Sequence, residues 1–427
     1  MDAEPPATEK EVGMEVFFTG TQGIGGRIKV EPEDFVVEEI STPPPPGDGK
    51  YTIARVEAKG WEMNALLKKM SSRLGIPVSA IGFAGMKDKR AITRQIMSFP
   101  CAMKDVSSVK LPGVNIDVLH KSRQKVFRGN LKGNRFDVLI RDTDGKKETV
   151  EKIYREIDRV GGFPNFFGIQ RFGVIRPITH LVGKYIVLGD MKKAVMTYAA
   201  NPIVGENEDS YMARKFLEET HDFSAALKIY PEKLTFERDM IYHLSKKEGD
   251  WKGALEKLPR NLSVMFVHAY QSYLFNRMLS MRLKMGLPIN EAVEGDIIID
   301  FKNGDVQSRN GKIVRKKNID KVNRQIEKGN CFPSGAIIGY DTELADGVMG
   351  EIERRIIEEE GIEPEKFAIH EMPFLSSRGM RRIILSPVGG MKWNMVGKSL
   401  RVSFSLPRGC YATCLLREFM KADMQNY

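Results

Sequence analysis

The sequence predicts an α+β fold in which a mainly helical segment is inserted into a domain built on β-strands. Strand patterns prevail at the start of the chain and return at residues 381–390 and 400–409. Between them, helical periodicity dominates from about Thr179 to Met285. A chain of 427 residues is also too long for one ordinary hydrophobic core, so at least two domains are expected.

The strand-rich beginning follows from β-branched runs and from the alternation of apolar and polar residues. Extended patterns lie at residues 26–40, 51–60, 113–120 and 135–141. Residues 64–75 instead place leucine and methionine side chains on one helical face, and Gly75 is typical of a helix C-cap. A second amphipathic helix is predicted over residues 150–160, because apolar residues recur there at helical spacing before Gly161.

Helical patterns cover most of the middle of the chain. They lie at residues 191–200, 210–219, 264–286, 319–329 and 347–361. Asn303-Gly304 and Asn310-Gly311 are typical of hairpin turns and predict a three-stranded meander among these helices. At the end of the chain, residues 400–406 alternate like a half-buried strand, and residues 411–422 are predicted to form a last helix.

The composition is that of a soluble globular protein, with 42% apolar and 29% charged residues. No apolar run approaches the roughly 18 residues that a membrane span needs. Residues 1–12 are acidic and lack the apolar stretch of a signal peptide. Four cysteines make no disulfide framework, so we expect a reducing, cytoplasmic location.

An excess of basic residues favours a polyanionic partner. The chain has 66 Lys and Arg against 56 Asp and Glu, a net charge of +10. The excess is concentrated in residues 121–135, a segment without acids that we call the basic segment. Its cations are Lys121, Arg123, Lys125, Arg128, Lys132 and Arg135. The basic segment is either a solvated turn or a surface that contacts phosphates, and Phe127 and Phe136 lie beside its charges, where they pack or stack.

The common motifs for cofactors and metals are missing from the sequence. The "VGKS" of residues 396–399 lacks the earlier glycine of a phosphate-binding loop and leads into a strand. No HExxH, paired CxxC or GxSxG motif occurs, and the six histidines are scattered. Cys410 and Cys414 lie on the apolar last helix, where we expect core residues. The sequence therefore predicts neither a cofactor nor a metal.

One acid stands out in "GFAGMKDKRAITRQ", residues 82–95, which we call the Asp88 loop. Asp88 is flanked by Lys87, Lys89 and Arg90. Nearby cations favour the ionised form of a carboxylate, which can then act as a nucleophile or a base. The alternative is an exposed turn whose charges are merely solvated, and the residues by themselves leave both interpretations open.

Four separated stretches, at residues 28–39, 82–95, 131–141 and 160–173, together resemble the TruD family of tRNA pseudouridine synthases. Weaker similarity extends to residues 269–280 and 403–418. The resemblance implies a pseudouridine-synthase catalytic core with a central, largely antiparallel mixed sheet, and an inserted α/β domain specific to TruD. It divides the chain into a catalytic domain at residues 1–180 and 373–427, and an inserted domain at residues 181–372.

The resemblance also implies an isomerase activity. The family detaches uracil from C1′ of its ribose, rotates the base and rejoins it through C5, and the expected target is uridine 13 of tRNA. Because no atoms are gained and no electrons are lost, the reaction requires neither cofactor nor metal. The expected partner is tRNA, with no membrane involved. The oligomeric state is not decided by the sequence, and a monomer is the simpler expectation.

By resemblance, Asp88 is the catalytic nucleophile, and attack on C6 of the base or on C1′ of the sugar both remain open. Lys29 is expected to be its basic partner in the active site. Asn165 is expected to bind the base edge or the sugar, and Phe167 to stack on the target base. Lys87 matches a family position beside the aspartate. Because adjacent side chains of an extended chain point apart, Lys87 is expected to bind the substrate through a phosphate instead.

Two other functions are less consistent with these residues. A non-catalytic RNA-binding protein of the same fold is disfavoured because Asp88, Lys29, Asn165 and Phe167 are all retained. A glycosidase would need a second carboxylate near Asp88, but the Asp88 loop supplies only bases. Glu39 matches a family acid, and we expect its role to be structural.

Overall fold

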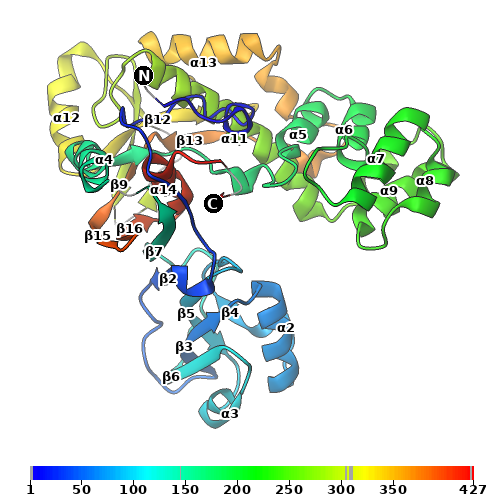
Figure 1. Cartoon of the computed structure of the whole chain (residues 1–427), viewed down its shortest axis with the longest axis horizontal. Helices are drawn as coiled ribbons and strands as arrows, with labels where there is room; N and C mark the ends of the chain where they lie inside the picture. Colours follow the sequence, from blue (N-terminus) through cyan, green and yellow to red (C-terminus); the bar gives the residue numbers. More distant parts are fainter. Residues whose placement is uncertain (1–2, 145, 303–304, 307–310, 424–425) are drawn as a thin grey trace.

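The protein has a central body, a smaller lobe and a helical arm (Figure 1). A computed structural model describes residues 3–144, 146–302, 305–306, 311–423 and 426–427. In Figure 1 the lobe lies at the bottom and carries strands from the first third of the chain. The arm lies to the right and consists of helices from the middle of the chain. None of the described helices is long and apolar enough to span a membrane.

A nine-stranded sheet runs from the central body into the lobe, in the order β15-β16-β7-β2-β5-β3-β6, with β1 on β7 and β4 on β5. Its strands are β1 (Gly25–Arg27), β2 (Phe35–Ile40), β3 (Tyr51–Lys59), β4 (Gly82–Phe83), β5 (Ile92–Phe99), β6 (Val114–Ser122), β7 (Gly133–Thr143), β15 (Gly389–Val396) and β16 (Ser399–Pro407). Strands β2 and β5 are parallel, and the other pairs of this sheet are antiparallel. The predicted mixed, largely antiparallel sheet is therefore confirmed.

Strands from both ends of the chain meet in the middle of this sheet. Strand β16 pairs with β7 in a register that sets Phe404 opposite Phe136. The two rings stack with centroids 5.2 Å apart, and Phe35 of β2 meets Phe136 edge-on at 6.0 Å. Phe136 is buried, so of Phe127 within the basic segment and Phe136 next to it, Phe136 packs in the core.

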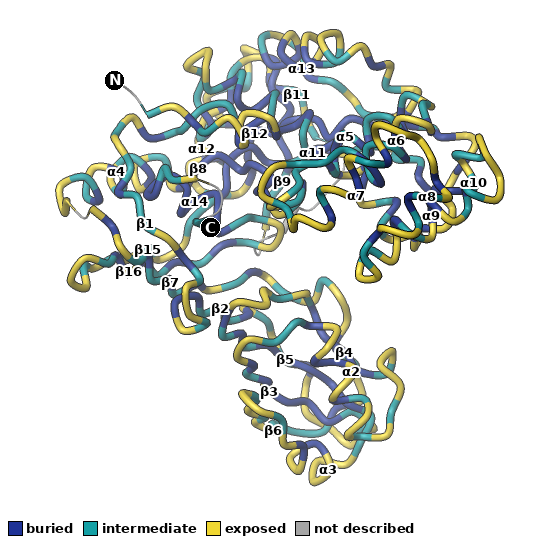
Figure 2. Tube along the Cα trace, turned by 45° about the vertical axis from the view of Figure 1, so that its right-hand side comes forward, coloured by how far each residue is buried: buried dark blue, intermediate teal, exposed yellow. Residues whose placement is uncertain are grey.

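Two helices complete the lobe, and two others cover the sheet in the body. Helix α2 (Met63–Leu74) buries the apolar face that its periodicity predicts and ends at Gly75, whose φ of 65° is left-handed. Helix α3 (Met103–Ser108) packs on β6. Helices α4 (Lys147–Val160) and α14 (Ala412–Met420) contact each other in the body. Figure 2 shows the buried strands β3 and β5 inside the lobe, with exposed segments around them.

A second sheet forms part of the body, in the order β10-β9-β12-β13, with β11 also on β9. Its strands are β9 (Ile297–Lys302), β10 (Asp305–Val306), β11 (Lys312–Ile313), β12 (Cys331–Ile337) and β13 (Met380–Ile383). Strand β8 (Gly162–Pro164) pairs separately with β14 (Leu385–Pro387). Most of the two predicted Asn-Gly turns, at residues 303–304 and 310, lies outside the described residues. Strands β10 and β11 both pair with β9.

The remaining helices build the arm and one side of the body (Figure 1). They are α1 (Ala7–Lys10), α5 (Thr179–Val187), α6 (Met191–Ala199), α7 (Glu208–Thr220), α8 (Phe223–Ile229), α9 (Thr235–Lys246), α10 (Trp251–Leu255), α11 (Arg260–Lys284), α12 (Ile319–Glu327) and α13 (Gly347–Glu359). The long helix α11 packs on α5, α13 and β12, and thereby joins arm and body. The division into domains at residues 180 and 372 stays a prediction. Strand β12 lies before residue 372 and β13 after it, and the two strands pair.

His180 lies at the start of α5, where the arm leaves the body. Its ring stacks on Tyr273 of α11 at 4.9 Å and meets Phe172 edge-on at 5.5 Å. The side chain is buried, and its Nδ1 has no hydrogen-bond partner among the described residues. This burial lowers the pKa of His180 to about 4, so the folded protein keeps the ring neutral at mildly acidic pH.

Acid is therefore expected to weaken this junction. Below pH 6.5 the unfolded chain protonates His180 while the folded chain does not, so stability falls as the pH drops from about 6.5 to 4. At about 1.4 kcal/mol per pKa unit, His180 accounts for a loss of roughly 3 kcal/mol. His180→Phe should remove that part of the pH dependence in urea unfolding. His221→Asn is the control, because His221 is exposed. Equal pH profiles for wild type and His180→Phe would show that His180 does not cause the loss of stability in acid.

Candidate active site

Lys29 is held in a strained backbone conformation, and its side chain contacts Asp88. It follows strand β1 with a φ of 56°, a left-handed value that costs a residue with a side chain roughly 1–2 kcal/mol. Its side chain is 10% exposed, and its Nζ lies 4.5 Å from the ring centroid of Phe35. From there Nζ donates a hydrogen bond to Asp88 Oδ1 at 3.3 Å.

Asp88 itself is open to solvent. Its side chain is 45% exposed, in contrast to the nearly buried lysine that it contacts. It lies in the loop between β4 and β5, two strands that belong to the lobe in Figure 1. The arrangement holds one carboxylate oxygen on a shielded ammonium group and leaves the carboxylate accessible to a large substrate. A carboxylate in this setting can act as a nucleophile.

Lys87 points into the protein, on the other side of the same loop. Its Nζ donates to Glu39 Oε2 at 3.0 Å, and the two side chains are 5% and 0% exposed. Glu39 lies on β2, and its Oε1 has no hydrogen-bond partner among the described residues. The ammonium group of Lys87 is therefore engaged by the protein, and the buried ion pair ties the Asp88 loop to the sheet.

The basic segment packs against the Asp88 loop. The N–H of Gly129 donates to the carbonyl of Ala84 at 2.8 Å. A Cβ on Gly82 would lie 2.4 Å from the carbonyl oxygen of Val126, so this close approach requires glycine. The structure thus brings the cations of residues 121–135 to the border of the loop that carries Asp88.

The six cations of the basic segment differ in how available they are. Exposed side chains belong to Arg123, Arg128, Lys132 and Arg135. Lys121 is half-buried, and its Nζ donates to the carbonyls of Lys50 and Cys101 at 2.9 and 3.0 Å. Lys125 donates to the carbonyl of Ser79 at 2.7 Å. The four exposed cations are therefore better placed than the other two to contact an external polyanion.

Asn165 lies just after strand β8 and is buried, with 1% exposure. Its Nδ2 donates to the carbonyl of Ile383 at 2.9 Å. Its Oδ1 accepts from Nη2 of Arg382 at 2.6 Å, and Nε of Arg382 also donates to the Asn165 carbonyl at 3.2 Å. Both polar atoms of the amide thus have protein partners, so a substrate contact by Asn165 would have to share or replace one of them.

Phe167 is 9% exposed and meets Phe275 and Tyr411 edge-on. The guanidinium carbon of Arg382 lies 4.1 Å from its ring centroid, and that of Arg171 lies 5.8 Å away. A base can stack on the face of Phe167 that Arg382 covers only if this guanidinium group moves aside. Sequence reasoning did not single out Arg382, because nothing in the pattern of its strand separates it from an ordinary surface arginine.

The turn at Arg408 and Gly409 links the basic segment, which borders the Asp88 loop, to Arg382. Nη1 of Arg408 donates to the carbonyl of Gly129 at 3.0 Å. The carbonyl of the next residue, Gly409, accepts from Nη2 of Arg382 at 2.9 Å. Continuous contacts therefore run from the Asp88 loop through the basic segment to Arg382, which holds Asn165 and covers Phe167.

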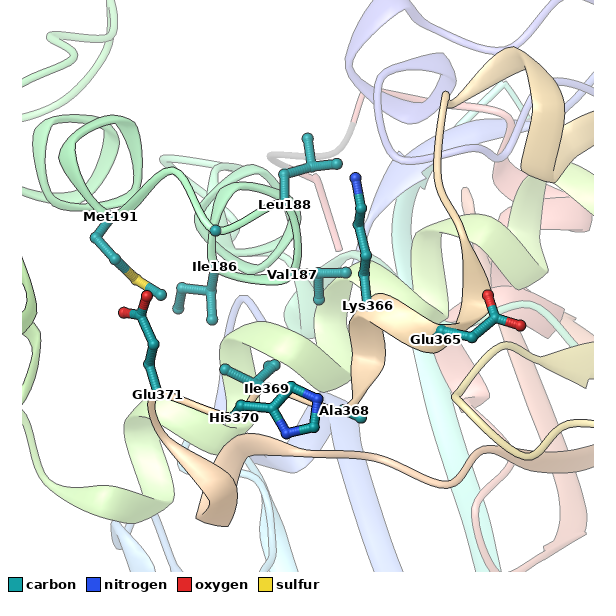
Figure 3. Close-up of a pocket in the computed structure, with 11 residues that line it drawn as sticks. Ile186, Val187, Leu188, Met191, Glu365, Lys366, Ala368, Ile369, His370 and Glu371 are labelled. Carbon is teal, nitrogen blue, oxygen red and sulfur yellow. The ribbon is translucent and has the colours of Figure 1, made fainter.

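A separate cavity of about 390 Å³ lies in the inserted segment (Figure 3). Apolar side chains at the end of α5, with Met191 of α6, form one wall, and Glu365, Lys366 and residues 368–371 form the other. None of the site residues predicted from the sequence lines this cavity. The described residues also contain no group of three or more His, Cys, Asp and Glu that could hold a metal ion.

Comparison with known proteins defines the class first. The structure is similar to the crystal structure of a TruD protein from Methanosarcina mazei, with a TM-score of 0.89 and 38% identity over 99% of this chain and 100% of that one. The fold is thus that of a pseudouridine synthase of the TruD type. The family model for tRNA pseudouridine synthase D (TruD) matches residues 11–419. This chain belongs to the TruD family.

Relatives of known name agree with this assignment. A protein from Methanosarcina acetivorans, named probable tRNA pseudouridine synthase D, is 41% identical over 434 residues, which cover 98% of each chain. A protein of the same name from Pyrococcus furiosus is 38% identical over 410 residues, which cover 96% of this chain and 99% of that one. The similarity therefore extends over both the strand-rich parts and the inserted segment.

Proposed function

We propose that this protein converts uridine 13 of tRNA into pseudouridine, with Asp88 as the nucleophile. Membership of the TruD family supports the reaction and the substrate class. The observation that carries the role of Asp88 is its contact with Lys29, a shielded ammonium 3.3 Å from an exposed carboxylate. This arrangement sets a cation beside a carboxylate that solvent, and hence substrate, can reach.

The proposed reaction breaks one bond of the ribose C1′ and forms another. Asp88 attacks either C6 of the uracil or C1′ of the ribose, and the bond between C1′ and N1 breaks. After the base has rotated, a bond forms between C1′ and C5, the C5 proton is lost, N1 gains a proton and Asp88 is released. Atoms and electrons balance without a further reactant. Lys29 counters the charge on Asp88 whenever the carboxylate is free, at the start and at the end of the cycle.

The target uridine must leave its stack in the folded tRNA before Asp88 can reach it. Such base flipping costs a few kcal/mol, which the enzyme offsets by contacts elsewhere on the RNA. The exposed cations of the basic segment border the Asp88 loop, so they are suited to hold the phosphates around the flipped nucleotide.

Mapping pseudouridine in a tRNA transcript tests the proposal. The purified protein is incubated with an unmodified transcript that has uridine at position 13, and with a matched transcript that has cytidine there. We expect pseudouridine at position 13 of the first and no product in the second. Product at another uridine would refute the target, and tight binding without any product would favour the non-catalytic RNA-binding protein.

The basic segment is expected to contribute a salt-dependent part of tRNA binding. Replacing Arg123, Arg128 and Lys132 by alanine should weaken binding and flatten the plot of log affinity against log salt by about one unit per lost phosphate contact. The measurement is binding of wild type and variant from low to moderate salt. Turnover at saturating tRNA should change much less, because Asp88 is untouched.

An equal loss of charge elsewhere in the lobe is the control. Helix α2 offers three exposed cations for this purpose, Lys68, Lys69 and Arg73. Replacing them by alanine should leave most of the salt slope in place if the RNA follows the basic segment. If the two triple variants have the same slope, the RNA does not follow the basic segment.

A further inference from the structure

Phe127 is an exposed aromatic residue in the middle of the basic segment. It is 60% exposed, whereas Phe136, which flanks the segment, is 6% exposed and packs in the core. Leaving a phenylalanine ring in water forgoes the free energy of burying it. Such a cost is explained most simply if the ring is covered when a partner binds.

The protein presents this ring on an anchored turn. The N–H of Asn130 donates to the carbonyl of Phe127 at 3.1 Å, which closes the turn. The N–H of Val126 donates to Ser98 Oγ at 3.0 Å on one side, and Gly129 bonds to Ala84 on the other. Phe127 is therefore held near the Asp88 loop and does not lie on a free tail.

The chemistry around Phe127 points to a polyanion with flat, apolar parts. Exposed cations flank the ring in the chain, at Arg123, Arg128 and Lys132. The guanidinium carbon of Arg128 also lies 5.2 Å from the ring centroid of Phe83, the residue just before Ala84. A protein partner would have to supply several acids around an apolar patch, whereas single-stranded RNA carries phosphates and base faces at every nucleotide.

We propose that Phe127 is a stacking platform for an unpaired nucleobase of the substrate RNA, close to the nucleotide that enters the Asp88 loop. This inference rests on the proposed function for the identity of the RNA. Phe127 contributes affinity and position, while Asp88 performs the chemistry. Because every base has an apolar face, the platform itself does not select one base.

Binding of unmodified tRNA to Phe127→Ala tests the proposal. Loss of one base stack should weaken binding roughly 5- to 100-fold. The salt slope should not change, because no charge is removed. Phe127→Trp should restore the affinity, and Phe127→Leu should not, since leucine is apolar but offers no flat face. Full affinity of Phe127→Ala, or equal rescue by leucine and tryptophan, would overturn the stacking role.

Two further measurements distinguish base stacking at residue 127 from a general effect of losing an exposed aromatic residue. Tyr242→Ala removes an aromatic residue of similar exposure, 57%, from helix α9, and should leave binding unchanged. The fluorescence of Phe127→Trp, corrected for wild type, should be quenched when tRNA binds, and an unchanged signal would also overturn the proposal. Urea unfolding checks that each variant is folded.

These measurements do not depend on turnover. If Phe127→Ala weakens binding but wild type forms no pseudouridine, the platform stands and the proposed function fails. If wild type forms pseudouridine at position 13 and Phe127→Ala binds normally, the proposed function stands and the platform fails.

Discussion

Asp88→Asn is expected to lower the rate of pseudouridine formation at saturating tRNA by at least about 10³-fold, as loss of a nucleophile does in other enzymes. Asparagine has nearly the same size and keeps an oxygen that can accept from Lys29, but its amide is not nucleophilic. The affinity for tRNA should stay close to that of wild type, because removing a negative charge takes no attraction away from the phosphates. Single-turnover assays and binding measurements test both parts.

The control for this variant is another exposed acid of the same lobe. Asp117 on β6 is exposed, so Asp117→Asn changes the charge by the same amount away from the Asp88 loop. It should leave the rate unchanged. Turnover within about tenfold of wild type by a sequence-verified Asp88→Asn sample would remove Asp88 from the chemistry.

Lys87→Met is expected to destabilise the protein by about 3–5 kcal/mol, because it leaves the buried carboxylate of Glu39 without its cation. Glu39 Oε1 already lacks a partner among the described residues, so little else can compensate. The free energy of unfolding in urea measures the effect. Activity should fall as well, because the pair anchors the loop that carries the adjacent Asp88.

A double variant and a neighbouring lysine complete this test. Glu39→Met together with Lys87→Met removes both charges and should recover much of the lost stability, since no unpaired charge remains. Lys89→Met removes the same charge from an exposed position and should change stability by less than about 0.5 kcal/mol. If Lys87→Met instead unfolds like wild type but binds tRNA more weakly, Lys87 contacts phosphate, as the family position also allows.

Local patterns were sufficient for the order and type of most elements. The helix predicted at residues 264–286 is α11, Arg260–Lys284, and the strand predicted at 400–409 is β16, Ser399–Pro407. The reason is that periodicity reports which face of an element is buried, whatever it is buried against. The strand order required the structure, because β16 pairs with β7 across more than half of the chain.

The residues of the candidate site were predicted from charge and from resemblance, and not from periodicity. The charge pattern drew attention to Asp88, and the resemblance added Lys29, Asn165 and Phe167 as predictions. That Lys29 and Asp88 form a pair required coordinates, since 59 residues separate them in the chain. The left-handed backbone of Lys29 that aims its ammonium group has no signature in the sequence.

The sequence by itself determined which chemical groups are present, namely a carboxylate among cations, a basic segment and an aromatic residue on either side of Arg128. Only the tertiary structure decided which of them face solvent. Lys87 and Lys89 are equivalent in the sequence, yet Glu39 from β2 buries the first and the second is exposed. Phe136 is covered by Phe404 from the far end of the chain, while no such neighbour covers most of Phe127. Burial depends on elements that are remote in sequence and adjacent in space, so local patterns cannot encode it.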